Sequence, residues 1–125
     1  MTSDEKKQYQ TPSEQQAALI YRLLSPEFPG CRELRHQAAV AKVVTVVSRG
    51  SPAIVFAPGL GPRADEVDVR IPVEAVGNDT DGGAIHILLH VLESYLAEIE
   101  MYREDGEPVL QLPDVHTLTV SLNRR

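Results

Sequence analysis

The sequence predicts an α+β fold in which one N-terminal helix, or two, packs on an antiparallel sheet of about five to six strands. Helical spacing of apolar residues is confined to the first 39 residues. The rest of the chain consists of short apolar or alternating runs, separated by turns rich in glycine, proline, asparagine and aspartate. Because no helical segments lie between these runs, the pattern disfavours a parallel sheet.

Length and composition predict a single domain over residues 11–122, preceded by a polar stretch, residues 1–10, that we expect to be disordered. The single cysteine, Cys31, leaves no partner for an internal disulfide and is typical of the cytoplasm. No run of about 18 apolar residues is present, so no membrane association is expected. The net charge of −6 argues against nucleic-acid binding and permits a basic protein partner.

The first helix is expected to begin with Thr11 as its N-cap, Pro12 in the first helical position and Glu14 closing a capping box. Apolar residues then recur at the spacing of one buried helical stripe. They are Ala17, Ile20, Tyr21 and Leu24, with Leu19 and Leu23 widening the stripe. Pro26 ends this helix. Residues 30–39 are predicted to form a second short helix or a turn.

The rest of the chain is predicted to form strands, because β-branched residues and period-two alternation dominate it. The predicted strands are residues 40–48, 53–57, 67–71, 85–91, 97–102 and 116–122. Turn residues precede and follow the pair 85–91 and 97–102, which we interpret as the central hairpin of the sheet.

Side-chain parity predicts which face of this hairpin is buried. If the isoleucines of both arms point inward, His86 and His90 share the opposite face with Glu98 and Glu100. This register requires an odd loop, and a three-residue turn fits. A turn at residues 92–94 places His86 opposite Glu100, whereas a turn at 93–95 places His90 opposite Glu98.

The group of His86, His90, Glu98 and Glu100 is the sharpest candidate for chemistry. Imidazoles and carboxylates are zinc ligands, and they also form acid–base pairs near neutral pH. Their spacing matches no specific metal motif, so a solvated or interface-facing sheet surface is the simpler interpretation.

Other motifs are absent or incomplete. The run Asp79-Thr80-Asp81-Gly82 lacks the glutamate that completes a calcium loop, and no glycine pattern fits a phosphate loop. We interpret Cys31 as a buried thiol. The sequence therefore predicts no catalytic residues, no cofactor and no enzyme activity.

The last third of the chain resembles the C-terminal sequence pattern of a known family. The residues that carry the resemblance are Asp81-Gly82-Gly83, the run 98–103 (EIEMYR), Asp105-Gly106 and Leu112-Pro113. This part of the chain is similar to small uncharacterised bacterial proteins of the DUF6984 type, which share a DG, apolar strand, LxELEIYRxDGxP and LP pattern. Some of these proteins sit among immunity-like proteins of polymorphic toxin systems. The resemblance covers the last third of the chain, and it implies a bacterial cytoplasmic origin and no catalytic residues.

Three functional hypotheses follow. The first is a non-enzymatic, immunity-like interaction protein that meets a basic partner through an acidic surface. The residues of this surface are Glu98, Glu100, Tyr102, Glu104 and Asp105. The second is a metal- or small-ligand-binding module that uses His86, His90, Glu98 and Glu100. The third is a structural homodimer in which an exposed strand edge pairs with its copy.

Overall fold

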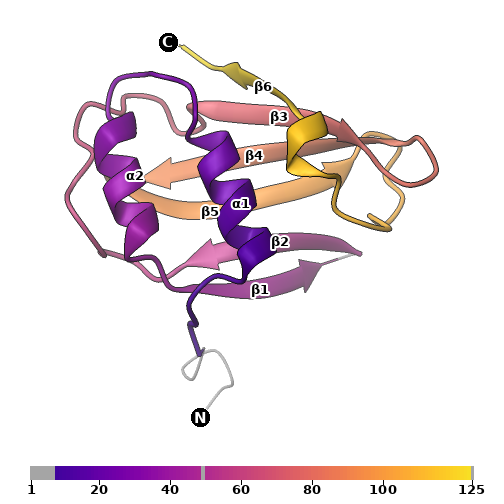
Figure 1. Cartoon of the computed structure of the whole chain (residues 1–125), viewed down its shortest axis with the longest axis horizontal. Helices are drawn as coiled ribbons and strands as arrows, with labels where there is room; N and C mark the ends of the chain where they lie inside the picture. Colours follow the sequence, from indigo (N-terminus) through magenta and orange to yellow (C-terminus); the bar gives the residue numbers. More distant parts are fainter. Residues whose placement is uncertain (1–7, 49, 125) are drawn as a thin grey trace.

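The computed structural model describes residues 8–48 and 50–124 and confirms the predicted α+β class (Figure 1). Two helices precede a six-stranded antiparallel sheet. The helices are α1 (Glu14–Leu23) and α2 (Cys31–Ala39), and a short 3-10 helix, η2, spans Val115–Thr117. The strands are β1 (Val43–Ser48), β2 (Ser51–Phe56), β3 (Val73–Asn78), β4 (Ala84–Leu92), β5 (Tyr95–Arg103) and β6 (Thr119–Leu122).

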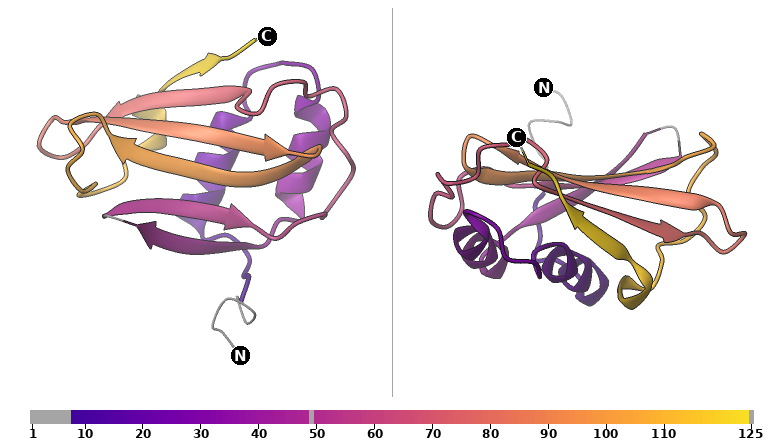
Figure 2. Two further views of the ribbon diagram at one scale, coloured as in Figure 1. Left: turned by 180° about the vertical axis from the view of Figure 1, so that it is seen from behind. Right: turned by 90° about the horizontal axis from the view of Figure 1, so that it is seen from above.

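The sheet has the order β1-β2-β5-β4-β3-β6, so the β4–β5 hairpin lies at its centre. Seen along its edge, both helices and η2 lie on one side, and the other side is uncovered (Figure 2). The core fills the space between the helices and the covered face. We call the uncovered side the open face.

Helix α1 begins two residues later than the sequence predicts. Its N-cap is Ser13, whose side chain accepts a hydrogen bond from the backbone N–H of Gln16 at 3.1 Å, while the Gln16 side chain accepts from Ser13 N–H at 2.9 Å. The predicted cap, Thr11, instead accepts a hydrogen bond from Lys42. The buried stripe is also rotated, because Leu19 and Leu23 are buried whereas Tyr21 is 46% exposed.

Of the two alternatives for residues 30–39, a short helix or a turn, the helix forms, with Cys31, Leu34 and Ala38 on its buried side as predicted. The predicted N-terminal disorder falls mainly on residues 1–7, which lie outside the described residues. Gln10 is described, and it forms an antiparallel bridge with Val43.

The third predicted strand, residues 67–71, is wrong. This segment is instead irregular, with a bend at residues 69–70, and the backbone carbonyl oxygen of Arg70 accepts a hydrogen bond from the backbone N–H of Val91. The strand that follows this segment is β3, and Gly77 interrupts its alternation of apolar and polar residues, which makes the strand hard to recognise in the sequence. A Cβ on Gly77 would lie 2.7 Å from Leu118 Cδ2, so glycine allows the segment before β6 to pack closely. The last strand is also shorter than predicted, because Val115–Thr117 forms η2.

The central hairpin has the predicted faces but a different turn. Glu93 and Ser94 form a two-residue turn, both at positive φ (51° and 74°). The register is even along most of the arms, with His90 opposite Glu98, and it shifts next to the turn, where Val91 pairs with Leu96. The extra residue on β5 is Ala97, so a short turn plus a bulge replaces the predicted three-residue loop. The bulge buries Leu96 and leaves Ala97 half-buried.

None of the helices among the described residues combines the length and the apolar character needed to cross a membrane.

Candidate interaction surface on the open sheet face

The open face consists of the side chains that alternate with the buried residues of each strand. Its central row contains Glu74, Leu88, Glu100, Ala53 and Val46, from β3, β4, β5, β2 and β1. The rows on either side contain Val76, His86 and Tyr102, and His90, Glu98, Val55 and Val44. The predicted His and Glu residues therefore do share one sheet face.

His90 is held by two neighbours on this face. Its Nε2 lies 2.8 Å from Glu100 Oε1, and its Nδ1 accepts a hydrogen bond from Arg70 Nε at 3.3 Å. Because a guanidinium can only donate, Nδ1 is the acceptor and Nε2–H donates to Glu100. Both ring nitrogens of His90 are thus used within the protein.

His86 pairs with a different carboxylate. Its Nε2 lies 2.9 Å from Glu104 Oε1, and its ring stacks on Tyr102 with centroids 5.1 Å apart. Tyr102 covers one side of the imidazole and is itself 38% exposed. This pairing forms a flat polar and aromatic patch near the end of β5.

The two histidines and their carboxylates do not converge. Within residues 8–48 and 50–124, no group of three or more His, Cys, Asp or Glu side chains is arranged to hold a metal ion. Glu98 lies opposite His90 in the register, yet in the described part of the chain it forms no hydrogen bond or ion pair. Glu98 is half-buried in the row next to the central row of the open face.

Asp105 is placed differently from the other predicted interface residues. It accepts hydrogen bonds from Arg103 Nε at 3.1 Å and from Arg103 Nη2 at 2.7 Å. Arg103 points to the covered side at the end of β5 and is only 6% exposed. The charge of Asp105 is therefore largely balanced within the protein.

Arg103 joins two further carboxylates from the β3–β4 turn. Its Nη1 donates to Asp79 at 3.2 Å and to Asp81 at 2.8 Å, and Asp79 also accepts from the backbone N–H groups of Leu110 and Gln111. A Cβ on Gly83 would collide with the guanidinium, so the glycine makes room for it. This network ties the β3–β4 turn, the end of β5 and the segment before η2 together.

The hydrogen bonds of this network also lower the pKa values of its carboxylates. The hydrogen bonds from Arg103, followed by that from Glu107 N–H, lower the pKa of Asp105 to about 2. Burial acts to raise the pKa of Asp79, but the N–H groups of Leu110, Thr80 and Gln111 outweigh it and lower the pKa overall. The carboxylates therefore stay ionised around Arg103 at neutral pH.

Gln37 anchors the opposite end of the hairpin. It is 2% exposed, and its Nε2 donates to the carbonyl oxygens of Pro62 at 2.6 Å and Ser94 at 2.9 Å. Its Oε1 accepts from Leu96 N–H at 2.8 Å. The side chain thereby fastens α2 to the β4–β5 turn and to the loop before β3.

Sequence reasoning missed Arg103 and Gln37. Arg103 shares the parity of Ile99 and Met101, and an arginine at an inward position of a strand is a signal of a buried ion pair, although the sequence does not show that Asp79 and Asp81 are its partners. Gln37 shares a helix face with Leu34, but nothing in the sequence indicates its distant backbone partners.

The family model described as a domain of unknown function (DUF6984) matches residues 9–113. The chain belongs to the DUF6984 family. This match extends from the bridge at Gln10 to the segment before η2, so it covers both helices and the first five strands, while β6 lies beyond it. Neither a curated protein nor a solved structure matches the chain.

Proposed function

We propose that this DUF6984 protein is a non-enzymatic interaction domain whose open face binds a basic partner protein, as an immunity-type antagonist does. The supporting observation is a wide sheet face that none of the described helices covers (Figure 2). By the strand register, this face carries acidic and apolar side chains together. Glu100 lies in its central row and Glu98 in the next row, Glu104 and Tyr102 lie at one end, and Val46 and Val55 lie on β1 and β2.

The chemistry of this face favours a cationic partner. Among the described residues, none bonds the Glu98 carboxylate, and a lysine or arginine from a partner would form a charge-assisted hydrogen bond with it. The apolar side chains around it would add area that is removed from water on binding. The overall charge of −6 would also speed the encounter with a basic protein.

The predicted contribution of Asp105 is smaller in this proposal, because Arg103 already neutralises it. The metal-binding alternative has less support, because His86 and His90 bond different carboxylates and His90 uses both ring nitrogens. The acidic surface is thus reduced to Glu98, Glu100 and Glu104, with Tyr102 beside them.

The test compares three proteins as bait in pull-downs from a lysate of the source organism. They are the wild type, Glu98→Lys and a matched control, Glu66→Lys, at an exposed loop position away from the open face. The proposal predicts a partner that is captured by the wild type and the control, is lost with Glu98→Lys, and weakens between about 50 and 300 mM salt. Salt-insensitive capture, equal capture by Glu98→Lys, or no partner at all would count against it.

A specific observation also favours the homodimer as a second candidate function. Strand β1 is an edge strand with no charged residue, and Val46 and Val47 are 39% and 66% exposed. Gln10 bridges Val43 from outside, so by alternation the backbone groups of Thr45 and Val47 also point outward. Such an edge is a template for another strand.

Light scattering at two protein concentrations tests the homodimer. Pairing through β1 predicts a dimer that Val47→Pro converts to a monomer, because proline removes the outward N–H. A wild-type monomer at both concentrations would contradict this candidate and leave the open-face proposal untouched.

A further inference from the structure

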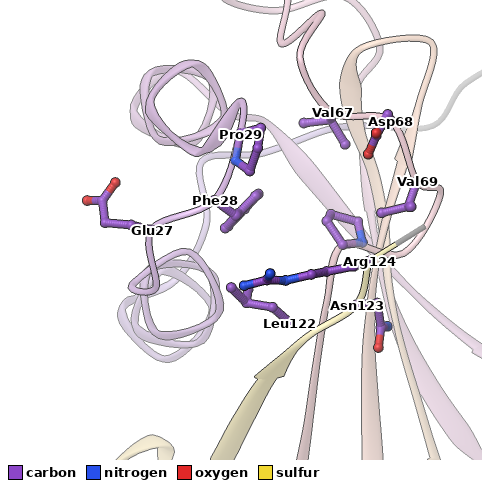
Figure 3. A pocket seen from close by; sticks show the side chains of 10 residues that line it. Glu27, Phe28, Pro29, Val67, Asp68, Val69, Leu122, Asn123 and Arg124 are labelled. Carbon is purple, nitrogen blue, oxygen red and sulfur yellow. The ribbon is translucent and has the colours of Figure 1, made fainter.

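A pocket of about 430 Å³ lies on the helix side of the molecule, away from the open face (Figure 3). It forms where the loop between α1 and α2, the segment before β3 and the end of β6 meet. Its volume is at the lower end of the range for small-molecule sites, roughly 300–1,000 Å³. Part of its wall, at residues 122–124, lies beyond the segment that matches the family.

Six of the ten residues that line this pocket are apolar. The apolar lining residues are Phe28, Pro29, Val67, Val69, Pro72 and Leu122. Phe28, Val67 and Leu122 also pack against the main core, so the walls are fixed from behind. An apolar molecule that enters would therefore meet a preformed surface, at little cost in ordering side chains.

Most polar groups around the pocket are already engaged. Glu27 points away from it (Figure 3) and holds Arg35 at 3.1 Å and the Cys31 thiol at 3.2 Å. The Asn123 amide nitrogen donates to Ile71 O at 2.9 Å and to Glu74 Oε2 at 2.6 Å. Neither group has its charge or its donors free for a ligand.

Arg124 is the exception. Its side chain extends across the pocket beside Leu122, with the guanidinium directed toward Phe28 (Figure 3). Within the described residues no hydrogen bond or ion pair involves this guanidinium. Asp68, the other charged lining residue without an ion pair in the described part of the chain, lies at the far end of the pocket from it (Figure 3).

We propose that this pocket binds a small monocarboxylate with an aromatic or branched apolar group. The carboxylate would pair with Arg124, because a guanidinium presents two parallel donors that match a carboxylate. The apolar group would lie between Phe28 and Val67 and against Leu122. A dicarboxylate or a phosphate fits less well, because Arg124 is the single cation among the lining residues and Asp68 would repel a second negative charge.

The experiment uses 3-phenylpropionate as the probe and the neutral 3-phenylpropionamide as its matched analogue. Methyl NMR spectra of the full chain are recorded during titration with each compound. The proposal predicts saturable shifts of the Val67, Val69 and Leu122 methyl signals, with the carboxylate bound at least about tenfold more tightly than the amide.

Two variants separate recognition of charge from the shape of the pocket. Arg124→Gln is expected to remove the preference for the carboxylate and to keep the weak binding of the amide. Arg32→Gln, an exposed position on α2 that does not line the pocket, is expected to behave as the wild type. The methyl spectra themselves report whether each variant is folded.

Several results would overturn the proposal. One is the absence of saturable shifts up to about 10 mM probe, which would mean that Arg124 simply covers the apolar walls. Another is equal affinity for the acid and the amide in the wild type. A third is a carboxylate preference that survives Arg124→Gln. Because the open face carries none of these residues, the outcome is independent of the pull-down with Glu98→Lys.

Discussion

Replacing Gln37 by leucine tests whether the hairpin turn is held by a single buried amide. The Leu96 N–H donates to Gln37 Oε1 in a buried position, and leucine at position 37 would offer it no acceptor. An unsatisfied buried donor costs about 1–3 kcal/mol. The carbonyl oxygen of Ser94 loses the hydrogen bond from Gln37 but keeps the one from Ala64 N–H at 2.9 Å. Loss of the first bond therefore adds about 0.5–1.5 kcal/mol to the destabilisation. Pro62 is exposed, and its carbonyl can bind water instead.

Together these terms predict that Gln37→Leu lowers the free energy of unfolding by about 2–4 kcal/mol. Urea unfolding followed by circular dichroism measures the change. The matched control is Gln15→Leu, the same substitution at an exposed position of α1, which is expected to change stability by less than about 0.5 kcal/mol. If the two variants unfold at the same urea concentration, the anchoring role of Gln37 is refuted.

A second substitution at the same site checks the direction of the hydrogen bonds. Gln37→Glu keeps the acceptor for Leu96 N–H but turns a carboxylate oxygen toward the carbonyls of Pro62 and Ser94. Protonation of that carboxyl would restore a donor. The destabilisation by Gln37→Glu should therefore shrink as the pH falls, whereas that of Gln37→Leu should not.

Two further predictions concern the ends of the hairpin. The folded-state pKa of Asp105 is about 2, below the ordinary value of 3.8. Its stabilising contribution is thus complete above about pH 4 and is lost as the pH falls toward 2. The free energy of unfolding should therefore fall less steeply over this range in Asp105→Asn than in the wild type. Parallel pH profiles of the two proteins would contradict the pairing with Arg103. At the turn, Glu93 has a φ of 51°, which asparagine tolerates better than glutamate does. Glu93→Asn should therefore raise the free energy of unfolding by about 0.5–1 kcal/mol. An unchanged free energy of unfolding in a urea titration would argue against strain at this residue.

The fold class could be predicted from the sequence because the helical period is clear in α1 and the period of two is clear in the central strands. The buried apolar residues of β4 alternate without interruption from Ile85 to Val91, and a one-residue slip would have buried Glu98 and Glu100. The turn could not be predicted, because Glu93 and Ser94 are not residues that favour positive φ. Their conformation is imposed by contacts with Gln37 and Ala64, which lie far away in the sequence.

The candidate site was predicted as a shared face but not as a set of pairs. Parity places His90 near Glu98 and Glu100, but only the side-chain rotamers decide that it bonds Glu100. Its second neighbour, Arg70, belongs to a segment that the alternation of Val67, Val69 and Ile71 misassigned as a strand. A pattern of alternate valines cannot tell a strand from a loop that crosses a core edge, because both bury every second side chain.

Gln37 and Arg103 stabilise the hairpin from the covered side, so the open face can be mutated without removing these contacts. Gln37 and Arg103 are buried, lie at opposite ends of β5, and hold the turns through hydrogen bonds on the covered side. The open-face pair of His90 and Glu100 is partly exposed and contributes at most about 1 kcal/mol. Glu98 forms no such bond within the described residues. Substitutions at Glu98 should therefore change binding without unfolding the sheet, and a loss of capture by Glu98→Lys can be attributed to the surface itself.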